Sequence, residues 1–500
     1  MARRRVLVQM PAVRAVKTDI PARLDRLPWS RWHWLVVVAL GTAWALNGLD
    51  VTVAAAVGPV LTEWQTLGLP GWEVGMAAAI YILGAVLGAL YFGYLSEALG
   101  RKKPLVIALS VFTVGAFASA LSWSFWSFAL FRFITGFGIG GEYTVINAAI
   151  VELIPARVRG RSSLAINGSF WIGGMVGAAV TIPLLDPRLL PHSIGWRAAL
   201  GVGLILLFAL LLIRRWVPES PRWLMARGRL AQANVALGSI EQQVQRDERL
   251  RRLPRPGSSI SLHPYGPLGW GDVASTLFRL YPKRFLLVFS LMAGQAFLYN
   301  SIFFTYGLVL TTFYGVSAGS VGIYLVFFAL GSVLGPWTLG RLFDTVGRKP
   351  VIAATYVISG ALLAATGYLF NLGILNAATQ TAAWSVTFFF ASAGASAAYL
   401  TASEIFPMEL RTASFAVVYA MGTAIGGLAG PLLFGALIQT GSSRELSYGY
   451  LVGAGLMVAA GVVELLVGVD TERRSLESIA RPLSAMDHRW VQREYGRRVA

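Results

Sequence analysis

The sequence contains no cysteine and only four histidines among its 500 residues. The missing cysteines exclude a disulfide framework and any thiolate metal site. The histidines fall at the ends of apolar runs or in polar segments, so none is expected to ligate a metal or relay protons through a membrane: His33, His192, His263 and His488. The sequence also has no GxxxxGK[ST] loop and no grouping of nucleophile and base. We therefore expect neither an enzyme nor a bound metal or cofactor.

Charged residues are scarce as well. They make up 13% of the chain, whereas hydrophobic residues make up 56%, and a soluble domain carries about 25% charge. Apolar runs of about 20 residues are long enough to cross the hydrocarbon core of a bilayer, which is about 30 Å thick. About twelve such runs occur, near residues 33–57, 74–95, 104–121, 126–151, 163–185, 197–216, 285–306, 319–341, 350–370, 378–405, 412–439 and 446–468. The composition predicts an all-α membrane protein with twelve transmembrane helices.

The basic residues are distributed unevenly between the loops. Residues 1–31 hold eight Lys or Arg and the polar stretch 217–284 holds eleven, whereas the loops assigned to the other side hold about three. This asymmetry follows the positive-inside rule and predicts cytoplasmic termini in a plasma membrane. The net charge of +18 is therefore attributed to the basic loops that set membrane topology, and no nucleic-acid partner is expected.

The polar stretches divide the chain into five parts. We expect a cytoplasmic tail, a six-helix bundle, a cytoplasmic linker, a second six-helix bundle and a cytoplasmic tail at residues 1–32, 33–216, 217–284, 285–468 and 469–500. The first part of the linker is expected to form short amphipathic helices. Its later part, residues 251–270, is rich in Pro and Gly and is expected to be irregular.

Two motifs occur once in each half of the chain. Residues 93–103 read GYLSEALGRKK and residues 340–350 read GRLFDTVGRKP. A second motif, Glu-x-x-Pro followed by Arg, begins at Glu152 and again at Glu404. The repetition of short charged loops between apolar runs indicates two pseudo-symmetric halves.

These motifs resemble those of the major facilitator superfamily, in particular its sugar porter branch with its organic-ion, phosphate and nicotinate relatives. Residues 132–161 are similar to the branch pattern R-x3-G-x-G-x-G…E-x2-P-x3-R-G, residues 218–224 read PESPRWL, and residues 474–479 read RSLESI. The resemblance extends from about residue 47 to 479. It implies a carrier in which two six-helix bundles surround a central cavity and work by alternating access, most simply as a monomer.

Few ionisable residues lie deep within the predicted spans. Asp50 lies in the first, and Arg132 and Glu142 lie in the fourth, where a charge normally pairs or lines a water-filled cavity. The resemblance implies that Asp50 and Arg132 form a proton-coupling pair, although a permanent structural pair in a uniporter is the alternative. Sugar porters carry a small residue at the position of Glu142. This carboxyl is interpreted as a second proton site or a counter-charge for a cationic substrate, or else as a carboxyl satisfied by neighbouring hydroxyls.

The resemblance also suggests where substrate binds. Gln295 and Asn300 keep two amides of the family's seventh-span motif, and Asn167 falls where the fifth span of the family carries a Gln. Tyr399 lies near the family's tenth-span Trp, and Trp384 is a further aromatic candidate. Amides offer both donors and acceptors, which suits a hydroxyl-bearing ligand.

The repeated loops predict a cytoplasmic gate. Glycines allow close helix approach, and the loop acids can face a helix N-terminus or an arginine. We expect Glu152 to pair with Arg159 and Glu404 with Arg411, either as a latch that breaks when the cytoplasmic side opens or as static surface pairs. The predicted gate residues are Gly93, Glu97, Arg101, Glu152, Arg159, Gly340, Asp344, Arg348, Glu404 and Arg411.

The expected function is proton symport of a small polar metabolite. Two alternatives remain open. A proton-antiport exporter of organic ions or drugs would have an apolar, aromatic cavity with Glu142 as its cation site. A non-transporting nutrient sensor would bind its ligand without flux.

Overall fold

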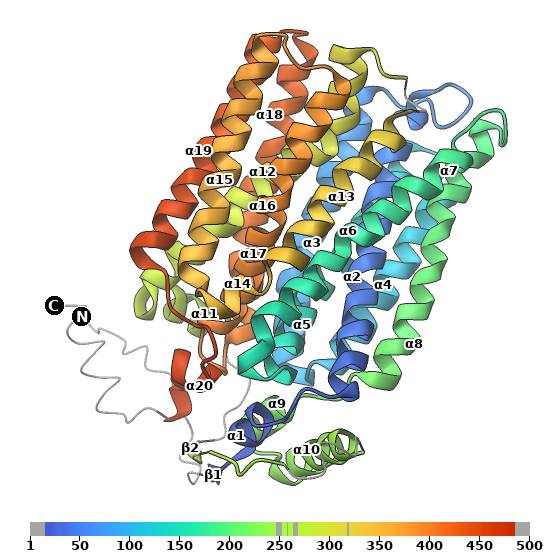
Figure 1. Ribbon diagram of the computed structural model, residues 1–500. Coiled ribbons are helices and arrows are strands. Elements are labelled where there is room, and N and C mark those ends of the chain that lie inside the picture. Colours follow the sequence, from blue (N-terminus) through green and yellow to red (C-terminus); the bar gives the residue numbers. More distant parts are fainter. Residues whose placement is uncertain (1–15, 247–252, 258, 264–268, 318–319, 486–500) are drawn as a thin grey trace, which may run out of the picture.

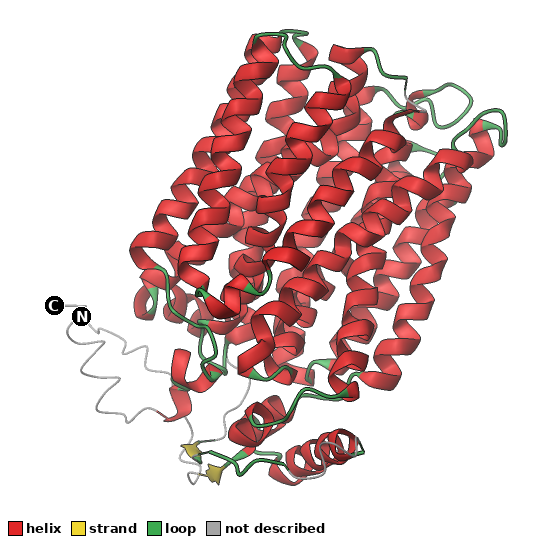
Figure 2. Cartoon of the chain, viewed as in Figure 1, coloured by secondary structure: helices red, strands yellow, loops and turns green. Residues whose placement is uncertain are grey.

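The computed structural model describes residues 16–246, 253–257, 259–263, 269–317 and 320–485. Nearly all of this chain is helical, and the long helices run side by side through the height of the molecule (Figures 1 and 2). Within these residues, ten helical segments are long and apolar enough to cross a membrane. Two further segments run parallel to these ten. One contains α7 and α8 and lies at the edge of the molecule in Figure 1, and the other is α5, a helix of 29 residues. Together they make up the twelve crossings.

Six crossings come from each half of the chain. The first half supplies α2 (Arg31–Val57), α3 (Gly71–Leu99), α4 (Lys102–Ala120), α5 (Phe125–Leu153), α6 (Arg159–Leu184), and α7 (His192–Gly201) joined through η3 (Val202–Ile205) to α8 (Leu206–Trp216). The second half supplies α12 (Pro282–Tyr314), α13 (Val321–Leu339) with α14 (Leu342–Thr345), α15 (Arg348–Asn371), α16 (Ala377–Glu404), α17 (Arg411–Gly422) joined through η7 (Thr423–Gly427) to α18 (Leu428–Gln439), and α19 (Ser443–Val467).

The two halves form two adjoining bundles. In Figure 1 the blue-to-green helices of the first half lie on one side and the yellow-to-red helices of the second half on the other. The bundles meet where α3 packs on α17 and where α6 packs on α13. This arrangement confirms the predicted all-α fold of two pseudo-symmetric six-helix bundles.

The repeated Gly-Arg-Lys motif has a backbone explanation. Gly100 ends α3 with φ of +94°, and Gly347 precedes α15 with φ of +116°. Residues with a side chain rarely adopt these values. Each glycine lets the chain reverse directly into the next crossing helix, so the motif repeats because the same sharp turn is built twice.

Glycines in α3 and α5 allow close packing of these two helices in the first bundle. A Cβ atom on Gly140 would lie 1.9 Å from the carbonyl oxygen of Ala85, and a Cβ on Gly88 would lie equally close to the carbonyl of Phe137. Small residues in such positions are typical of membrane helix interfaces. The close contact holds α5, which carries Arg132 and Glu142, firmly against α3.

Short elements gather at one end of the bundles, below them in Figure 1. They are α1 (Ile20–Asp25), α9 (Pro221–Ala226), α10 (Leu230–Gln245), α11 (Trp270–Ser275), α20 (Leu476–Ile479), and the strands β1 (Val16–Thr18) and β2 (Ile260–Leu262). We call this the linker end. The expected short linker helices are present as α9 and α10. The small antiparallel sheet, in which Val16 pairs with Leu262, was not predicted, because three-residue strands leave no periodic pattern.

Candidate functional site

A cavity of about 120 Å³ lies between the two bundles, lined by residues of α2, α3, α5, α6, α12, α16, α17 and η7. Ten of its 24 lining residues are aromatic. Trp44, Tyr143, Tyr399 and Tyr419 form one cluster, in which the Trp44 and Tyr143 ring centroids lie 4.1 Å apart. A second cluster contains Phe170, Trp171, Tyr299 and Phe388. Each cluster takes rings from both bundles, so rocking of the bundles would change both.

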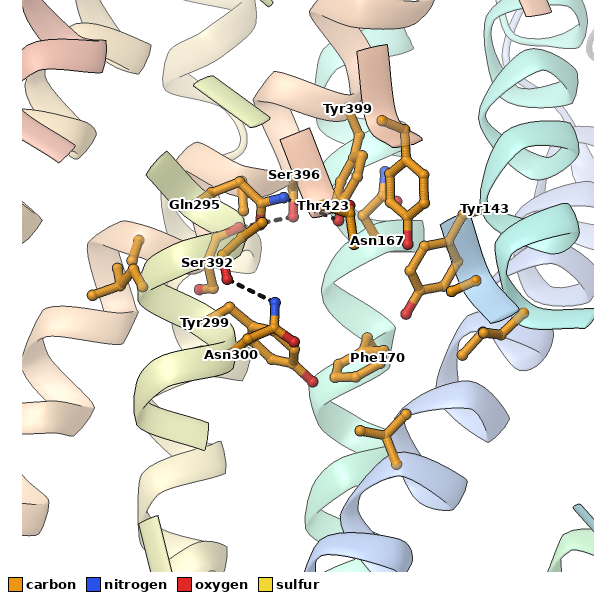
Figure 3. Close-up of a pocket in the computed structure, with 18 of the residues that line it drawn as sticks. Tyr143, Asn167, Phe170, Gln295, Tyr299, Asn300, Ser392, Ser396, Tyr399 and Thr423 are labelled. Carbon is orange, nitrogen blue, oxygen red and sulfur yellow. Dashed lines mark hydrogen bonds between the residues drawn. The ribbon is translucent and has the colours of Figure 1, made fainter. Parts of the chain in front are cut away.

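The polar lining is made of amides and hydroxyls. Asn167, Gln295, Asn300 and Tyr399, all predicted to bind substrate, line this cavity together with Ser392, Ser396 and Thr423. In Figure 3 the side chains of Gln295 and Asn300 lie across the cavity from Tyr143. Gln295 Nε2 donates to the Tyr399 hydroxyl at 3.3 Å. The structure thus brings four of the five candidate binding residues together.

Trp384 does not join them. Its side chain is fully buried and absent from the cavity wall. It packs inside the second bundle against Tyr306 and Tyr450, with ring centroids 5.0 and 6.3 Å apart. The prediction for Trp384 is therefore corrected: this face of α16 points toward α12 and α19 and not toward the first bundle.

Asp50 and Arg132 form an ion pair beside the cavity. Arg132 Nη1 donates to Asp50 Oδ2 at 3.2 Å, and both side chains are buried. The Arg132 guanidinium also lies 4.6 Å from the ring centroid of Tyr81, which lines the cavity. The Arg132 side of the pair is thus in contact with a ring of the cavity wall.

Glu142 is fully buried and has no hydrogen-bond partner among the described residues. The amide of Asn47 lies beside it, although neither group reaches hydrogen-bonding geometry. The alternative that Tyr143 or Thr144 satisfies this carboxyl is not supported, because the Thr144 hydroxyl donates to the carbonyl of Gly140. An unpaired carboxylate in an apolar interior is costly, whereas a protonated carboxyl is far less so. Glu142 does not itself line the cavity.

At the linker end, the acids of the repeated loop motif, Glu97 and Asp344, each face the N-terminus of a helix in the opposite bundle. Glu97 accepts the backbone N–H of Thr412 at 3.1 Å, at the start of α17. Asp344 accepts the N–H groups of Gly160 and Arg161 at 3.1 and 2.8 Å, at the start of α6. Acids are favoured at these positions because helix N-termini carry partial positive charge and unpaired N–H groups.

The glycines of the same motif lie where the bundles meet. A Cβ atom on Gly93 would lie 2.4 Å from Ala416 of α17, and one on Gly340 would lie 3.6 Å from Leu164 of α6. At Gly93 a larger residue would push the bundles apart. The two motifs therefore bring helices and acids together across the interface.

The loop arginines pair differently from the sequence expectation. Arg159 Nη1 lies 3.1 Å from Glu404, and Arg348 contacts the same carboxylate. Glu152 is held by Arg101 at 2.8 Å. The expected pairs Glu152–Arg159 and Glu404–Arg411 are not formed. The reason is geometric: Arg159 begins α6 at the interface and reaches the end of α16 in the opposite bundle.

Residues of the linker and tails extend this charged network. Arg222 of the PESPR segment forms two ion pairs. It lies 3.0 Å from Asp25, which precedes the first span, and 3.3 Å from Glu477 of α20. Glu219 accepts the backbone N–H of Arg101 at 2.7 Å, and burial raises the pKa of this carboxyl above its usual value. Sequence analysis placed this motif but gave it no role at the interface.

The aromatic lining was largely missed. Trp44, Tyr81, Phe170, Tyr299 and Tyr419 line the cavity, yet none was predicted. Helices that are apolar on every side give no periodic signal for the face that borders a cavity. Only polar residues stand out in such helices, which explains why the amides were found.

Two helical bundles around a central cavity, with ion pairs closing one end, define a membrane transporter of the major facilitator class. The chain belongs to the family "Sugar (and other) transporter", whose model matches residues 34–483. This membership confirms the predictions of a multi-pass membrane transporter and of a protein that is not an enzyme.

The relatives span nearly the whole chain. A putative metabolite transport protein of Bacillus subtilis, YyaJ, is 28% identical over 91% of this chain and 96% of its own length. The niacin transporter NiaP of Acinetobacter baylyi is 26% identical over 92% of this chain and 99% of its own. The proton:xylose symporter XylE bound to 6-bromo-6-deoxy-D-glucose matches 90% of this chain and 98% of its own with a TM-score of 0.73 at 19% identity, which supports the fold.

Proposed function

We propose that this protein is a proton symporter that takes up a small polar metabolite by alternating access, with Asp50 and Arg132 as its coupling pair. The observation that carries the proposal is the buried 3.2 Å ion pair next to a central cavity. Ionised Asp50 holds Arg132, and protonation of Asp50 releases it. The Arg132 guanidinium lies over the ring of Tyr81, a residue of the cavity wall, while it is paired. Occupation of the cavity and protonation of Asp50 are coupled through this ring.

The linker-end contacts supply the gate. Glu97 to Thr412, Asp344 to the start of α6, and Arg159 to Glu404 all join opposite bundles. In the proposed cycle they form while the linker end is closed and break when it opens to the cytoplasm. The basic residues of the tails and linker support a cytoplasmic position for this end. The transporter works as a monomer in the plasma membrane.

The substrate is a small molecule of the size of one ring. One water molecule needs about 10–15 Å³ of comparable cavity space, so a cavity of about 120 Å³ has room for about ten non-hydrogen atoms. The niacin transporter among the relatives supports a substrate of this size.

An exporter of organic cations is the second candidate function. The aromatic cavity favours it, because ring faces attract cations. Against it stands the position of Glu142, which would be the cation's counter-charge but does not line the cavity.

The test is proton movement in proteoliposomes that enclose a pH-sensitive dye. Sugars, nicotinate and its amide, phosphate and organic cations are added outside at two pH values. The proposal expects that one substrate acidifies the lumen, and that Asp50→Asn abolishes the acidification but retains substrate exchange. Glu142→Gln, run in parallel, determines whether Glu142 is a second proton site. Substrate entry without proton entry in the unmodified protein would instead identify a uniporter with a structural Asp50–Arg132 pair.

A further inference from the structure

We propose that the cavity binds an uncharged, planar aromatic compound of a single ring that carries at least one N–H or O–H donor. This inference rests on the proposed function, because it names the substrate class of that transporter. Four properties of the cavity support it: the two aromatic clusters, the hydrogen-bonding state of the polar lining, the absence of charge from the wall and the size.

The aromatic clusters favour a flat ring. The Trp44–Tyr143 cluster and the Phe170–Trp171–Tyr299 cluster both supply rings to the cavity wall. Aromatic pairs gain about 0.5–1.5 kcal/mol beyond the burial of their area when rings stack or meet edge to face. A planar aromatic ligand gains this additional energy by contact with either cluster, whereas a saturated polyol does not.

The polar side chains have mostly used their donors within the protein. Asn300 Nδ2 donates to the Ala296 carbonyl at 2.6 Å, and Asn167 Nδ2 to the Ser163 carbonyl at 3.0 Å. The hydroxyls of Ser392 and Ser396 donate to the carbonyls of Ser332 and Ser392 at 2.8 and 2.9 Å. A ligand with many acceptors therefore finds few free donors among these amides and serines. Elsewhere in the wall, Trp44 Nε1 is a donor without a partner among the described residues.

Two oxygens of the lining that can accept a hydrogen bond are also available to a ligand. Asn167 Oδ1 and the Tyr299 hydroxyl are buried and have no partner among the described residues. Both side chains line the cavity, and Figure 3 shows them in its wall. A buried polar atom without a partner costs about 1–3 kcal/mol. A ligand that donates an N–H or O–H group removes this cost at Asn167 Oδ1, whereas a carboxylate, which only accepts, does not.

The cavity wall is also uncharged: its described residues include no Asp, Glu, Lys, Arg or His. An anionic ligand would find no cationic partner at the wall. A cationic ligand would find no acid there, and the Arg132 guanidinium already lies on the Tyr81 ring. Burying an unpaired charge is strongly unfavourable. The bound species is therefore neutral, such as a carboxamide, a phenol or an un-ionised carboxylic acid.

The test is a binding assay on the purified full-length protein, at neutral pH and without a proton gradient. The probes are benzamide, benzoate, benzylammonium and D-xylose, of which the first three share one ring and differ in charge. We expect benzamide to bind about tenfold more tightly than the other three. Tyr299→Phe and Asn167→Leu should each weaken benzamide binding about five- to tenfold.

Tyr450→Phe is the matched control for Tyr299→Phe. It also removes a buried hydroxyl without a partner, but Tyr450 packs inside the second bundle and does not line the cavity. It should leave benzamide binding unchanged. If both tyrosine variants weaken binding equally, the effect comes from the fold and the inference is wrong.

The other outcomes are also decisive. The inference is overturned if D-xylose, benzoate or benzylammonium binds most tightly, or if none of the four probes binds. The result is independent of the symport test. A protein that prefers D-xylose and still moves protons refutes the aromatic ligand alone, whereas benzamide binding that never moves protons refutes symport alone.

Discussion

The two halves of the chain carry the same loop motifs, but the arginine that follows Glu-x-x-Pro makes different contacts in each half. Arg159 of the first half reaches across the interface to Glu404. Arg411, its counterpart in the second half, is buried, and none of its three guanidinium nitrogens has a hydrogen-bond partner in the described chain. Glu152, the acid that symmetry would offer to Arg411, is held by Arg101 instead. Equal motifs therefore do not give equal contacts: Glu404 pairs with both Arg348 and Arg159, whereas Glu152 pairs with Arg101 and forms no ion pair with Arg411.

Removing these two arginines should have the largest and most unequal effects. We expect Arg159→Met to lower the free energy of unfolding by about 3 kcal/mol, because it breaks a buried ion pair. Arg411→Met should leave stability unchanged or raise it by about 1 kcal/mol, because a methionine replaces a buried cation that makes no hydrogen bond with the described residues. Thermal unfolding of both variants in the same detergent measures the difference. Equal losses would show that Arg411 is engaged as strongly as Arg159.

The two helix-capping acids should differ less. Asp344 accepts two backbone N–H groups and Glu97 accepts one. We expect Asp344→Ala to weaken closure of the linker end by about 1.4 kcal/mol and Glu97→Ala by about half as much. These losses correspond to about a tenfold and about a threefold increase in the labelling rate of a cysteine introduced by Ser403→Cys.

This labelling experiment is clean because the chain has no native cysteine. Ser403 is buried near the end of α16, and the proposed gate expects it to become accessible when the linker end opens. Glu445→Ala is the control, because Glu445 also lies in the first turn of a helix but is exposed and outside the gate. An identical labelling rate in all three variants would contradict a gating role for the two acids.

These residues show which features of the structure can be predicted from the sequence. It predicted the fold, because continuous apolar runs and charge asymmetry are local properties. It also singled out Asp50, Arg132 and the cavity amides, since a polar residue in an apolar helix is conspicuous. The Arg159–Glu404 contact was not predictable in the same way, because it depends on where two bundles cross.

The smallest effect concerns the tail segment α1 and the linker helix α10. Arg23 and Arg26 bind Glu241 at 2.6 and 2.7 Å. Burial would raise the pKa of Glu241, but these hydrogen bonds outweigh it and lower the pKa below its usual value. The stabilisation is therefore complete above the pKa of the unfolded chain and is lost as pH falls through the lowered folded value.

We expect the loss to be about 0.5–1 kcal/mol, because the pair lies near the surface. Hydrogen exchange of the amides of Ile20–Asp25, corrected for intrinsic rates, should show weaker protection in acid than at neutral pH. Glu241→Gln should show the weaker protection at both pH values. Protection that is independent of pH in the unmodified protein would assign the docking of α1 to its apolar contacts.

The small sheet at the linker end has a consequence for biosynthesis. Strand Val16–Thr18 is synthesised before the first membrane helix, but its partner Ile260–Leu262 follows the sixth crossing. The contact between Asp25 and Arg222 likewise waits for the linker. The amino-terminal segment must therefore remain undocked while an entire bundle enters the membrane. Its docking can begin only after the first half of the protein and the linker have been synthesised.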